Sequence, residues 1–372
     1  MVPISQDVLD IKNKTRNNLF KWNGQFSPQL IEALLDVYAK DNYKVLDPFS
    51  GSGTVLYECA RKGISALGVD VNPAANRISK VYELCRLSIK KREGLTKEFN
   101  VILNVDNVND GYDYLLSVNS ECRYTKIIRD SLIVLLDNVN DLYKFHRIVS
   151  GFFSVLLSMP YSKKHVNAIN FDCRNIPIRA NSIDLVITSP PYVNVFNYHQ
   201  QYRKNTELLG YDILKIAKSE IGSNRKNRPN RFRTLTQYCK DISMSLNELI
   251  RVSKRGSRLI FIVGKYSTIK KAKVYNGEIV KNLGLSMGLE LVLDQTRTFK
   301  NRFGQDIVEE IIHFENIDNK VISKNDLEKI SEQVAMEALL KTRSTISDNR
   351  VADEIQAAIS TVSSTSCSPI YI

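Results

Sequence analysis

The sequence predicts an α/β fold with a mostly parallel, doubly wound sheet. Short apolar runs suited to buried strands alternate with longer stretches in which apolar residues recur at helical spacing. The first such run leads into a glycine turn and a helix, as in a strand–helix–strand unit, and a later run ends in two consecutive prolines. Ligands of doubly wound sheets bind at the carboxyl ends of the strands, so functional residues are expected there.

The first 89 residues contain the clearest alternation. A helix is expected from Phe26 to Tyr38, with Ser27 as its N-cap and Pro28 as its first residue. Two strands are expected at 43–47 and 66–71, and two further helices at 54–62 and 75–87.

The remaining chain divides into three parts. Residues 90–167 contain apolar, mostly helical segments without regular alternation, which indicates a helical insertion. Residues 168–318 resume the alternation, with strands expected at 183–188, 259–263, 289–293 and 307–314 and a helix at 235–252. Residues 319–372 turn polar and include the Ser/Thr-rich run 360–368, so a loose helix followed by disorder is predicted.

Charge and composition indicate which partners, location and metal or disulfide sites to expect. The 372 residues carry a formal net charge of +12 with a pI near 9.3, which favours a polyanionic partner such as nucleic acid or an acidic membrane surface. The first twenty residues lack the apolar stretch of a signal peptide, and apolar runs such as 132–136 are too short to span a bilayer, so a cytoplasmic location is expected. The six cysteines are too widely spaced to predict a zinc site or a disulfide framework.

A glycine turn follows the strand that ends at Asp47. In Phe49-Ser50-Gly51-Ser52-Gly53, the glycines allow a tight turn and close approach of the backbone to a nucleotide-like ligand. Asp70, at the end of the next strand, is placed to accept hydrogen bonds from ribose hydroxyls. A nicotinamide or flavin site is the alternative, but Leu56 occupies the position of the third glycine of that motif, and Asp47 suits a cationic ligand better than a pyrophosphate.

A second motif, Ser189-Pro190-Pro191-Tyr192, follows the strand at 183–188. Prolines cannot continue a strand ladder, so they make a stiff loop at the carboxyl end of that strand. An isolated Pro-Pro-Tyr can be no more than a strand stop. Next to a nucleotide-binding turn, the loop would place Ser189 and Tyr192 beside the ligand.

With both motifs present, the chain resembles the amino-group DNA methyltransferases. That family carries a Phe-x-Gly-x-Gly turn for the methyl donor and an (Asp/Asn/Ser)-Pro-Pro-(Tyr/Phe) loop for catalysis, and both are matched here. The resemblance extends to Gln25-Phe26-Ser27-Pro28 and to Asn170-Phe171-Asp172, where the family has an acidic residue that meets the adenine of the donor. It covers roughly residues 22–82 and 170–314. The glycine turn precedes the Ser-Pro-Pro-Tyr loop, whereas many relatives with that loop have the reverse order.

The resemblance implies a Rossmann-like class I methyltransferase fold, S-adenosylmethionine as cofactor and double-stranded DNA as partner. Residues 1–89 and 168–318 would form the catalytic domain, and the insertion 90–167 would serve target recognition or dimerisation. The implied donor-binding residues are Phe26, Ser27, Asp47, Phe49, Gly51, Gly53, Thr54, Asp70 and Asp172. The implied catalytic residues are Ser189, Pro190, Pro191 and Tyr192.

The chemistry expected of the loop is activation of a weak nucleophile. The lone pair of a base amino group is delocalised into the ring, and acceptors such as the Ser189 hydroxyl and the Pro190 carbonyl would direct it toward the methyl group. Tyr192 would stack on a base flipped out of the duplex. In this family, serine at the first loop position tends to accompany methylation of cytosine N4 and aspartate that of adenine N6, so cytosine is expected.

Residues 200–235 carry nine Lys/Arg residues against three acidic ones, a composition suited to phosphate contacts. We expect DNA contacts from Arg203, Lys204, Arg225, Lys226, Arg228, Arg231 and Arg233, although such charge runs also occur as solvated surfaces. The resemblance further implies a restriction endonuclease that shares the target site without stable binding. An N6-adenine enzyme, an RNA methyltransferase and a non-catalytic DNA-binding protein remain the alternatives.

Overall fold

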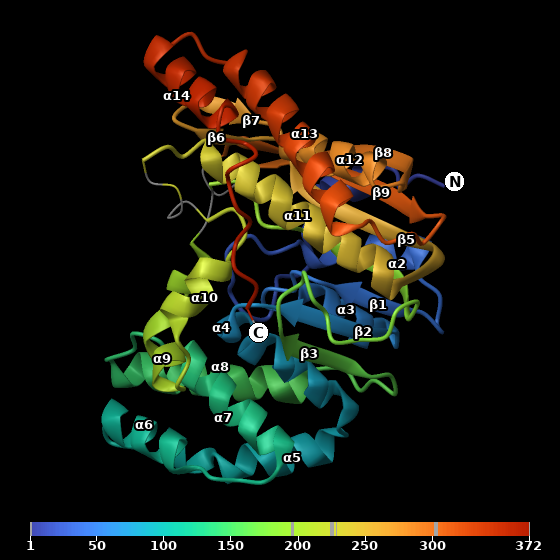
Figure 1. Cartoon of the computed structure of the whole chain (residues 1–372). Coiled ribbons are helices and arrows are strands. Elements are labelled where there is room, and N and C mark those ends of the chain that lie inside the picture. Colours follow the sequence, from blue (N-terminus) through green and yellow to red (C-terminus); the bar gives the residue numbers. More distant parts are fainter. Residues whose placement is uncertain (1, 195–196, 224–226, 228, 301–303, 372) are drawn as a thin grey trace.

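A computed structural model describes residues 2–194, 197–223, 227, 229–300 and 304–371, and it contains a seven-stranded sheet in the order β3-β2-β1-β4-β5-β9-β8 (Figure 1). The strands are β1 Lys44–Asp47, β2 Ser65–Asp70, β3 Val166–Asn170, β4 Ile183–Thr188, β5 Ser253–Gly264, β8 Glu290–Lys300 and β9 Asp306–Asn316. The first five pair in parallel, and β9 is antiparallel to both β5 and β8. This is the mostly parallel, doubly wound sheet of a Rossmann-like fold, as predicted. A small hairpin, β6 Ser267–Ile269 and β7 Ala272–Val274, forms a second sheet.

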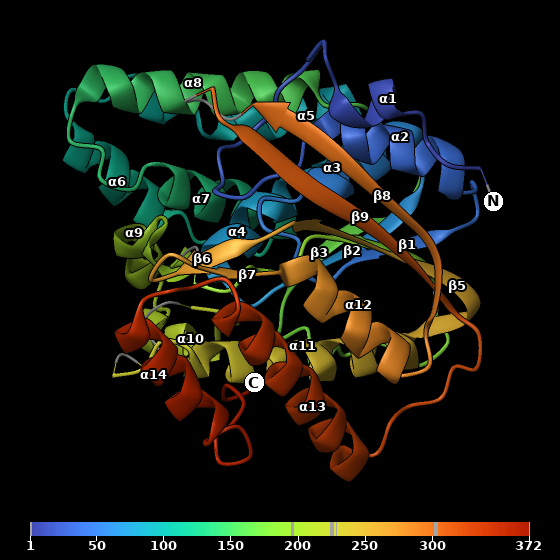
Figure 2. The same cartoon turned by 90° about the horizontal axis from the view of Figure 1, so that it is seen from above.

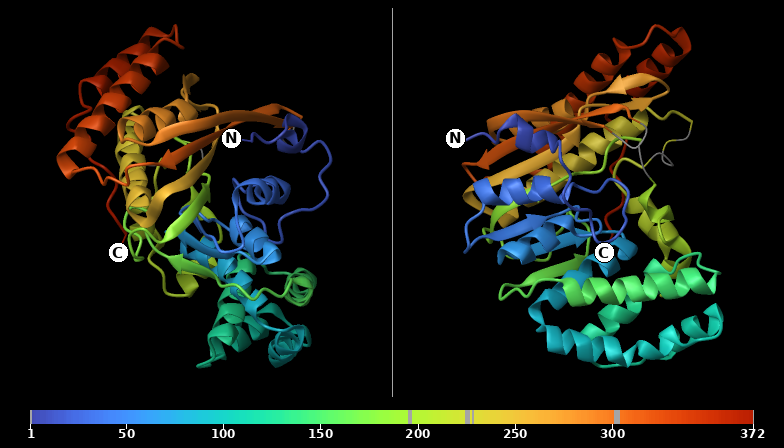
Figure 3. Two further views of the ribbon diagram at one scale, coloured as in Figure 1. Left: turned by 90° about the vertical axis from the view of Figure 1, so that its right-hand side faces the viewer. Right: turned by 180° about the vertical axis from the view of Figure 1, so that it is seen from behind.

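Helices cover both faces of the sheet, because successive side chains of a strand point to opposite faces. Val45 of β1 packs with α2 Pro28–Tyr38, α3 Thr54–Lys62 and α4 Pro73–Ser79. Leu46, the next residue, packs on the other side. The helices on that side are α11 Arg233–Val252, α12 Asn276–Ser286, α13 Lys324–Arg343 and α14 Asn349–Ile359. The left view of Figure 3 shows the two layers on either side of the sheet, and Figure 2 shows α13 and α14 on the side opposite α2.

The chain changes direction within the sheet between β1 and β4. From β1 it runs outward through β2 to β3, and it then crosses back to place β4 on the other side of β1. The connections that leave the carboxyl ends of two such neighbouring strands lead in opposite directions and leave a crevice, which is where doubly wound sheets bind their ligands. The glycine turn follows β1 and the Ser-Pro-Pro-Tyr loop follows β4, so both motifs lie at this point.

The predicted insertion is helical, and it shares one hydrophobic core with α2 and α3. It comprises α5 Ile89–Glu98, the short 3-10 helix η2 Asn100–Leu103, α6 Val108–Ser117, α7 Arg123–Leu135 and α8 Leu142–Ser158. The helix predicted at 75–87 is instead α4 followed by a 3-10 helix, η1 Lys80–Arg86.

One strand of the sheet was not predicted. β3 begins at Val166, inside the range assigned to the insertion, and pairs with β2. In its sequence Val-Asn-Ala-Ile-Asn, two asparagines interrupt the apolar residues, so this edge strand lacks the continuous apolar run of a fully buried strand.

Residues 319–372, expected as a loose helix followed by disorder, instead contain two packed helices and a partly buried terminal segment. Helix α13 buries Leu327, Val334 and Leu339 in the same core as α11, and α14 adds Ile355. Beyond α14 the chain runs back along α11 to the middle of the molecule (Figure 1), and Ser368 is 1% exposed there. The polar composition did not reveal this packing, because most serines of the run stay exposed while Val362, Thr365 and Ser368 are buried.

The remaining elements are short. They are α1 Gln6–Asp10, η3 Tyr198–Gln200, α9 Arg203–Leu208 and α10 Ile213–Ser219. None of the described helices combines the length and the apolar character that crossing a membrane requires.

Candidate functional site

A cavity opens where β1, β2 and β4 end. It encloses about 840 Å³ of empty space, part of which is open to solvent. The predicted site residues that line it are Phe26, Phe49, Gly51, Thr54, Asp70, Asp172, Ser189 and Pro191. The fold therefore brings both sequence motifs to one cavity.

The glycine turn forms one side of the cavity. Gly51 has φ +50° and donates its N–H to Asp70 Oδ2 at 2.8 Å, while Asn72 donates its N–H to Asp70 Oδ1 at 2.8 Å. Burial raises the pKa of Asp70 to about 6. Asp70 thus holds the two chain segments that follow β1 and β2 together at the cavity.

The segment before α2 covers this turn. Gln25 Nε2 donates to Ser52 Oγ at 2.5 Å, and the Trp22 ring lies so close to Gly51 that a Cβ on that glycine would meet Trp22 Cδ1 at 3.1 Å. Tyr198 stacks on Trp22 with ring centroids 6.4 Å apart and planes at 7°. Trp22 and Tyr198 both line the cavity, so an aromatic pair borders it.

Asp47 and Thr188 join the two motifs beneath the cavity. Asp47 Oδ1 accepts the Thr188 hydroxyl at 2.7 Å and the Phe49 N–H at 3.2 Å, and Asp47 is 1% exposed. Burial raises the pKa of Asp47 to about 7, against the lowering effect of these two donors.

The Ser-Pro-Pro-Tyr loop forms the opposite side. The Ser189 and Tyr192 hydroxyl oxygens lie 3.4 Å apart, and the Tyr192 ring packs over Gly264, where a Cβ would meet Tyr192 Cε2 at 3.1 Å. Gly222 supports the loop from below: it accepts the Asn194 N–H at 2.9 Å, and a Cβ on it would lie 2.9 Å from the Tyr192 carbonyl oxygen. The loop is therefore held by backbone contacts that leave no room for larger side chains.

The lining of the cavity is acidic. It includes Asp70, Asp172 and Glu220 and contains no lysine, arginine or histidine among the described residues. Glu220 is 4% exposed, and its Oε2 lies 2.5 Å from Nδ1 of the buried His199. Asp172 is paired with the buried Arg174, so Asp70 and Glu220 are the carboxylates that favour a ligand with positive charge.

Not every predicted residue reaches the cavity. Ser27 caps α2, Gly53 precedes α3 and Asp47 lies beneath the turn, and neither Pro190 nor Tyr192 is among the lining residues. The direct ligand contacts predicted for these residues stay predictions.

Several lining residues were not predicted as site residues. The main ones are Trp22, Cys173, Tyr198, Ser219, Glu220 and Ile221. Trp22 is the single tryptophan of the chain and lies just before the Gln-Phe-Ser-Pro segment, so its position in the sequence could have indicated a site residue. The others lie outside both motifs, so only the packing of the chain reveals them.

The predicted DNA-contacting residues come from separate elements. Arg203 and Lys204 stand on α9, where Arg203 pairs with Glu207 at 2.8 Å. Arg231 and Arg233 are exposed at the start of α11. Arg225, Lys226 and Arg228 lie outside the described residues.

Comparisons with known proteins agree with the motifs. A sequence model of the DNA methylase family matches residues 5–81. The type II methyltransferase M.AvaI of Nostoc sp. is 22% identical over 285 residues, which are 58% of this chain and 59% of that protein. The type II methyltransferase M.MjaII of Methanocaldococcus jannaschii is 30% identical over 128 residues, 32% of this chain and 24% of that protein. The chain thus spans at most about three-fifths of either relative.

Among solved structures, a SAM-dependent methyltransferase from Methanosarcina mazei aligns with a TM-score of 0.37 and 12% identity over 76% of this chain and 97% of its own. The resemblance to DNA methylases rests instead on the sequence matches, on the two motifs and on their meeting at the ends of β1 and β4. These findings support a relationship between this chain and the amino-group (N6/N4) DNA methylases.

Proposed function

We propose that this protein is an S-adenosylmethionine-dependent DNA methyltransferase that acts on an exocyclic amino group of a base. The observation that carries the proposal is the Asp47–Thr188 hydrogen bond, which places the glycine turn and the Ser-Pro-Pro-Tyr loop on opposite sides of one cavity. The relatives that this sequence matches are type II methyltransferases, which supports this activity.

The residues of the cavity fit this donor. S-adenosylmethionine supplies an electrophilic methyl group on a sulfonium and also carries an ammonium group. The carboxylates of Asp70 and Glu220 would offset these charges, and no cationic side chain among the described lining residues opposes them. The left-handed backbone of Gly51 lets the ligand approach the main chain closely.

On the opposite side, Ser189 would orient the target. Its hydroxyl can accept a hydrogen bond from the amino N–H, which draws the nitrogen lone pair out of the ring and toward the donor. The target base must leave the duplex to reach the cavity, at a cost of a few kcal/mol. Stacking on an aromatic ring is worth roughly 1–3 kcal/mol, and Tyr192, with the Tyr198–Trp22 pair nearby, would supply it.

The finer proposal is that the target is N4 of cytosine in double-stranded DNA. It rests on serine at position 189, as expected from the family resemblance. The net charge of +12 and the exposed Arg231 and Arg233 support binding to a DNA backbone. We further propose, from the type II relatives alone, that a restriction endonuclease shares the target sequence.

Mass spectrometry of nucleosides tests both the proposed methylation of DNA and the choice of cytosine N4. DNA of mixed sequence is incubated with the protein and S-adenosylmethionine, and RNA is treated in parallel. N4-methyldeoxycytidine is expected. N6-methyldeoxyadenosine instead would contradict the choice of cytosine, and the absence of any modified deoxynucleoside would contradict the proposed activity.

Two variants separate donor binding from transfer. Ser189→Ala should reduce transfer by roughly 10²-fold or more, as loss of a positioned catalytic hydrogen bond does, while S-adenosylhomocysteine still binds. Gly51→Val should lose S-adenosylhomocysteine binding, because its side chain would collide with Trp22. Titration calorimetry measures binding, and equal transfer by Ser189→Ala and the unmodified protein would exclude the role of Ser189.

A further inference from the structure

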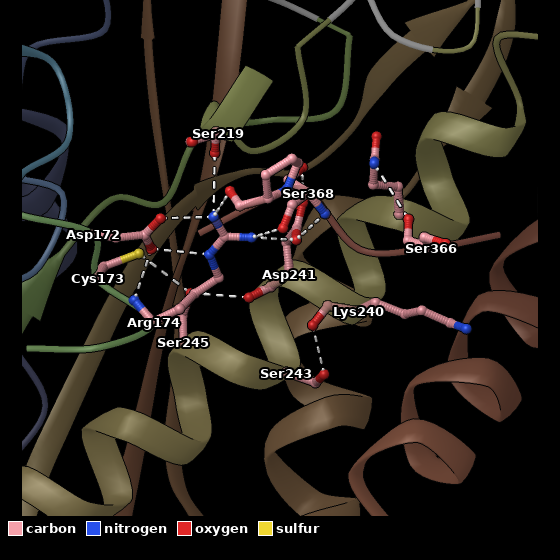
Figure 4. Close-up of polar contacts among 12 residues, drawn as sticks. Asp172, Cys173, Arg174, Ser219, Lys240, Asp241, Ser243, Ser245, Ser366 and Ser368 are labelled. Carbon is pink, nitrogen blue, oxygen red and sulfur yellow. Dashed lines mark hydrogen bonds and ion pairs between the residues drawn. The ribbon is translucent and has the colours of Figure 1, made fainter. Parts of the chain in front are cut away.

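The segment 368–371 returns to the wall of the cavity from the far end of the chain. After α14, the backbone passes along α11, where Gln237 Nε2 donates to the Ser366 carbonyl at 3.2 Å (Figure 4). Ser368 then binds Asp241 twice: its N–H donates to Oδ1 at 2.8 Å and its hydroxyl to Oδ2 at 2.5 Å. Both residues are at most 1% exposed, so this is a buried attachment.

Arg174 connects this segment to Asp172, and its guanidinium lies between Asp172 and Asp241 (Figure 4). Nε donates to Asp172 Oδ1 at 2.9 Å, and Nη2 donates to Asp172 Oδ2 at 2.6 Å and to the Pro369 carbonyl at 2.8 Å. Nη1 donates to Asp241 Oδ1 at 2.7 Å and to the Ser368 carbonyl at 2.8 Å. A guanidinium has five N–H groups, and these contacts use them all.

The carboxylate of Asp172 also has all of its acceptor positions in hydrogen bonds. Its Oδ1 accepts hydrogen bonds from the backbone N–H and from the side-chain Nε of Arg174. Its Oδ2 accepts hydrogen bonds from Arg174 Nη2 and, at 3.0 Å, from the backbone N–H of Tyr371. A carboxylate offers about four acceptor positions, so segment 368–371 supplies one of the four donors that hold Asp172.

This cluster stands directly behind the lining of the cavity. Asp172 and Cys173 line it, and the Cys173 Sγ lies 3.3 Å from the Ser245 hydroxyl on α11. Ser219, at the end of α10, lines it as well, and its carbonyl lies 3.5 Å from Arg174 Nη2. Arg174 therefore touches the two stretches of chain that form this wall, one after β3 and one after α10.

We propose that Arg174 is a positioning residue for the methyl-donor pocket and that segment 368–371 is a required part of that pocket. The inference rests on the proposed function and adds residues that neither motif contains. A buried charge left without its partner is strongly unfavourable, so loosening the segment must be accommodated by movement of Arg174 and, through it, of Asp172 and Ser219. Donor binding and docking of the segment are consequently coupled, and the coupling is reciprocal.

The test compares substitutions of two serines in the whole 372-residue chain. Ser368→Ala removes the side-chain bond to Asp241. Ser366→Ala is the matched control, because Ser366 is exposed and its contact with Gln237 uses the backbone carbonyl, which the substitution leaves in place. Titration with S-adenosylhomocysteine should give a Kd about fivefold or more higher for Ser368→Ala, a typical coupling factor, and a Kd within about twofold of the unmodified protein for Ser366→Ala. Equal dissociation constants for all three proteins would overturn the inference.

A second measurement needs no substitution and so covers the case in which Ser368→Ala does not fold. Saturating S-adenosylhomocysteine should slow amide hydrogen exchange in the peptide that contains residues 368–371, because the coupling is reciprocal. Unchanged exchange there, with protection of the glycine turn, would refute the role of the segment while leaving the proposed function intact. If the unmodified protein binds no S-adenosylhomocysteine, the proposed function fails and the inference with it.

Discussion

The Thr188 hydroxyl donates a 2.7 Å hydrogen bond to Asp47 Oδ1, although the two residues are 141 positions apart in the chain. Asp47 ends β1 and Thr188 ends β4, so this bond fixes the distance between the turn after one strand and the loop after the other. Both residues are at most 1% exposed, and water does not compete for the contact.

Thr188→Val should destabilise the protein by about 1–3 kcal/mol. The valine keeps the shape of threonine but leaves a buried carboxyl oxygen without its hydroxyl donor, which costs the desolvation of that oxygen. Urea unfolding measures the change. Thr268→Val, at an exposed position of β6, is the control and should change stability by less than about 0.5 kcal/mol. Similar losses for both variants would contradict the role of the Asp47–Thr188 bond.

Asp47→Asn should alter the pH dependence of stability. Burial raises the pKa of Asp47 to about 7, well above the value of about 3.9 for an unfolded chain. Between these values the folded state holds the proton and the unfolded state releases it, so this group lowers the free energy of unfolding as pH rises from about 4 to about 7. Asparagine can still accept from Thr188 and Phe49 but does not titrate. The difference in the free energy of unfolding, variant minus unmodified protein, should therefore rise as pH increases from about 4 to about 7. A difference that does not change with pH would exclude titration of Asp47 in this range.

Gly53→Ala should destabilise the protein more than Gly63→Ala. Both glycines have left-handed backbones, with φ +85° and +65°, so both substitutions carry a backbone strain of about 1–2 kcal/mol. At Gly53 a Cβ would also lie 2.9 Å from Ser79 Cβ and Tyr82 Cε2, whereas at Gly63 it would meet nothing within 4 Å. Chemical denaturation of the two variants gives the comparison directly. An equal loss would show that the turn has room to adjust.

His313→Leu should be neutral or stabilising by up to about 1 kcal/mol at neutral pH. His313 is fully buried in β9 beside Tyr38, and neither ring nitrogen has a hydrogen-bonding partner among the described residues. Removing a buried polar group that makes no hydrogen bond relieves its desolvation cost. A loss of more than about 2 kcal/mol in thermal or urea unfolding would indicate that the imidazole makes an important contact.

The same variant should resist acid better. Burial lowers the pKa of His313 to about 3, below the unfolded value near 6.5. As pH falls from about 6.5 to about 3, the unfolded state takes up a proton that the folded state does not, so stability contributed by this group is lost. The leucine variant lacks this loss, and unfolding curves at a series of pH values would reveal it as a growing advantage toward low pH.

The sequence by itself determined the features that depend on neighbouring residues. The α3 helix was predicted at its observed bounds, β1, β4 and α11 to within two residues, and α2 from its Ser27-Pro28 start. These features follow from hydrophobic periodicity, from the fixed φ of proline and from the freedom of glycine, all of which act over a few residues. The two motifs were visible for the same reason.

Only the tertiary structure decided which distant groups meet. The edge strand β3 and the packed helices α13 and α14 gain their stability from contacts with β2 and α11 rather than from their own composition. Asp172 shows the same limit: the family resemblance implied a ligand contact, whereas its carboxylate is held by Arg174 and by Tyr371, which is 199 positions away. Burial makes such pairings obligatory, because a buried charge must find partners, but no local pattern specifies which ones.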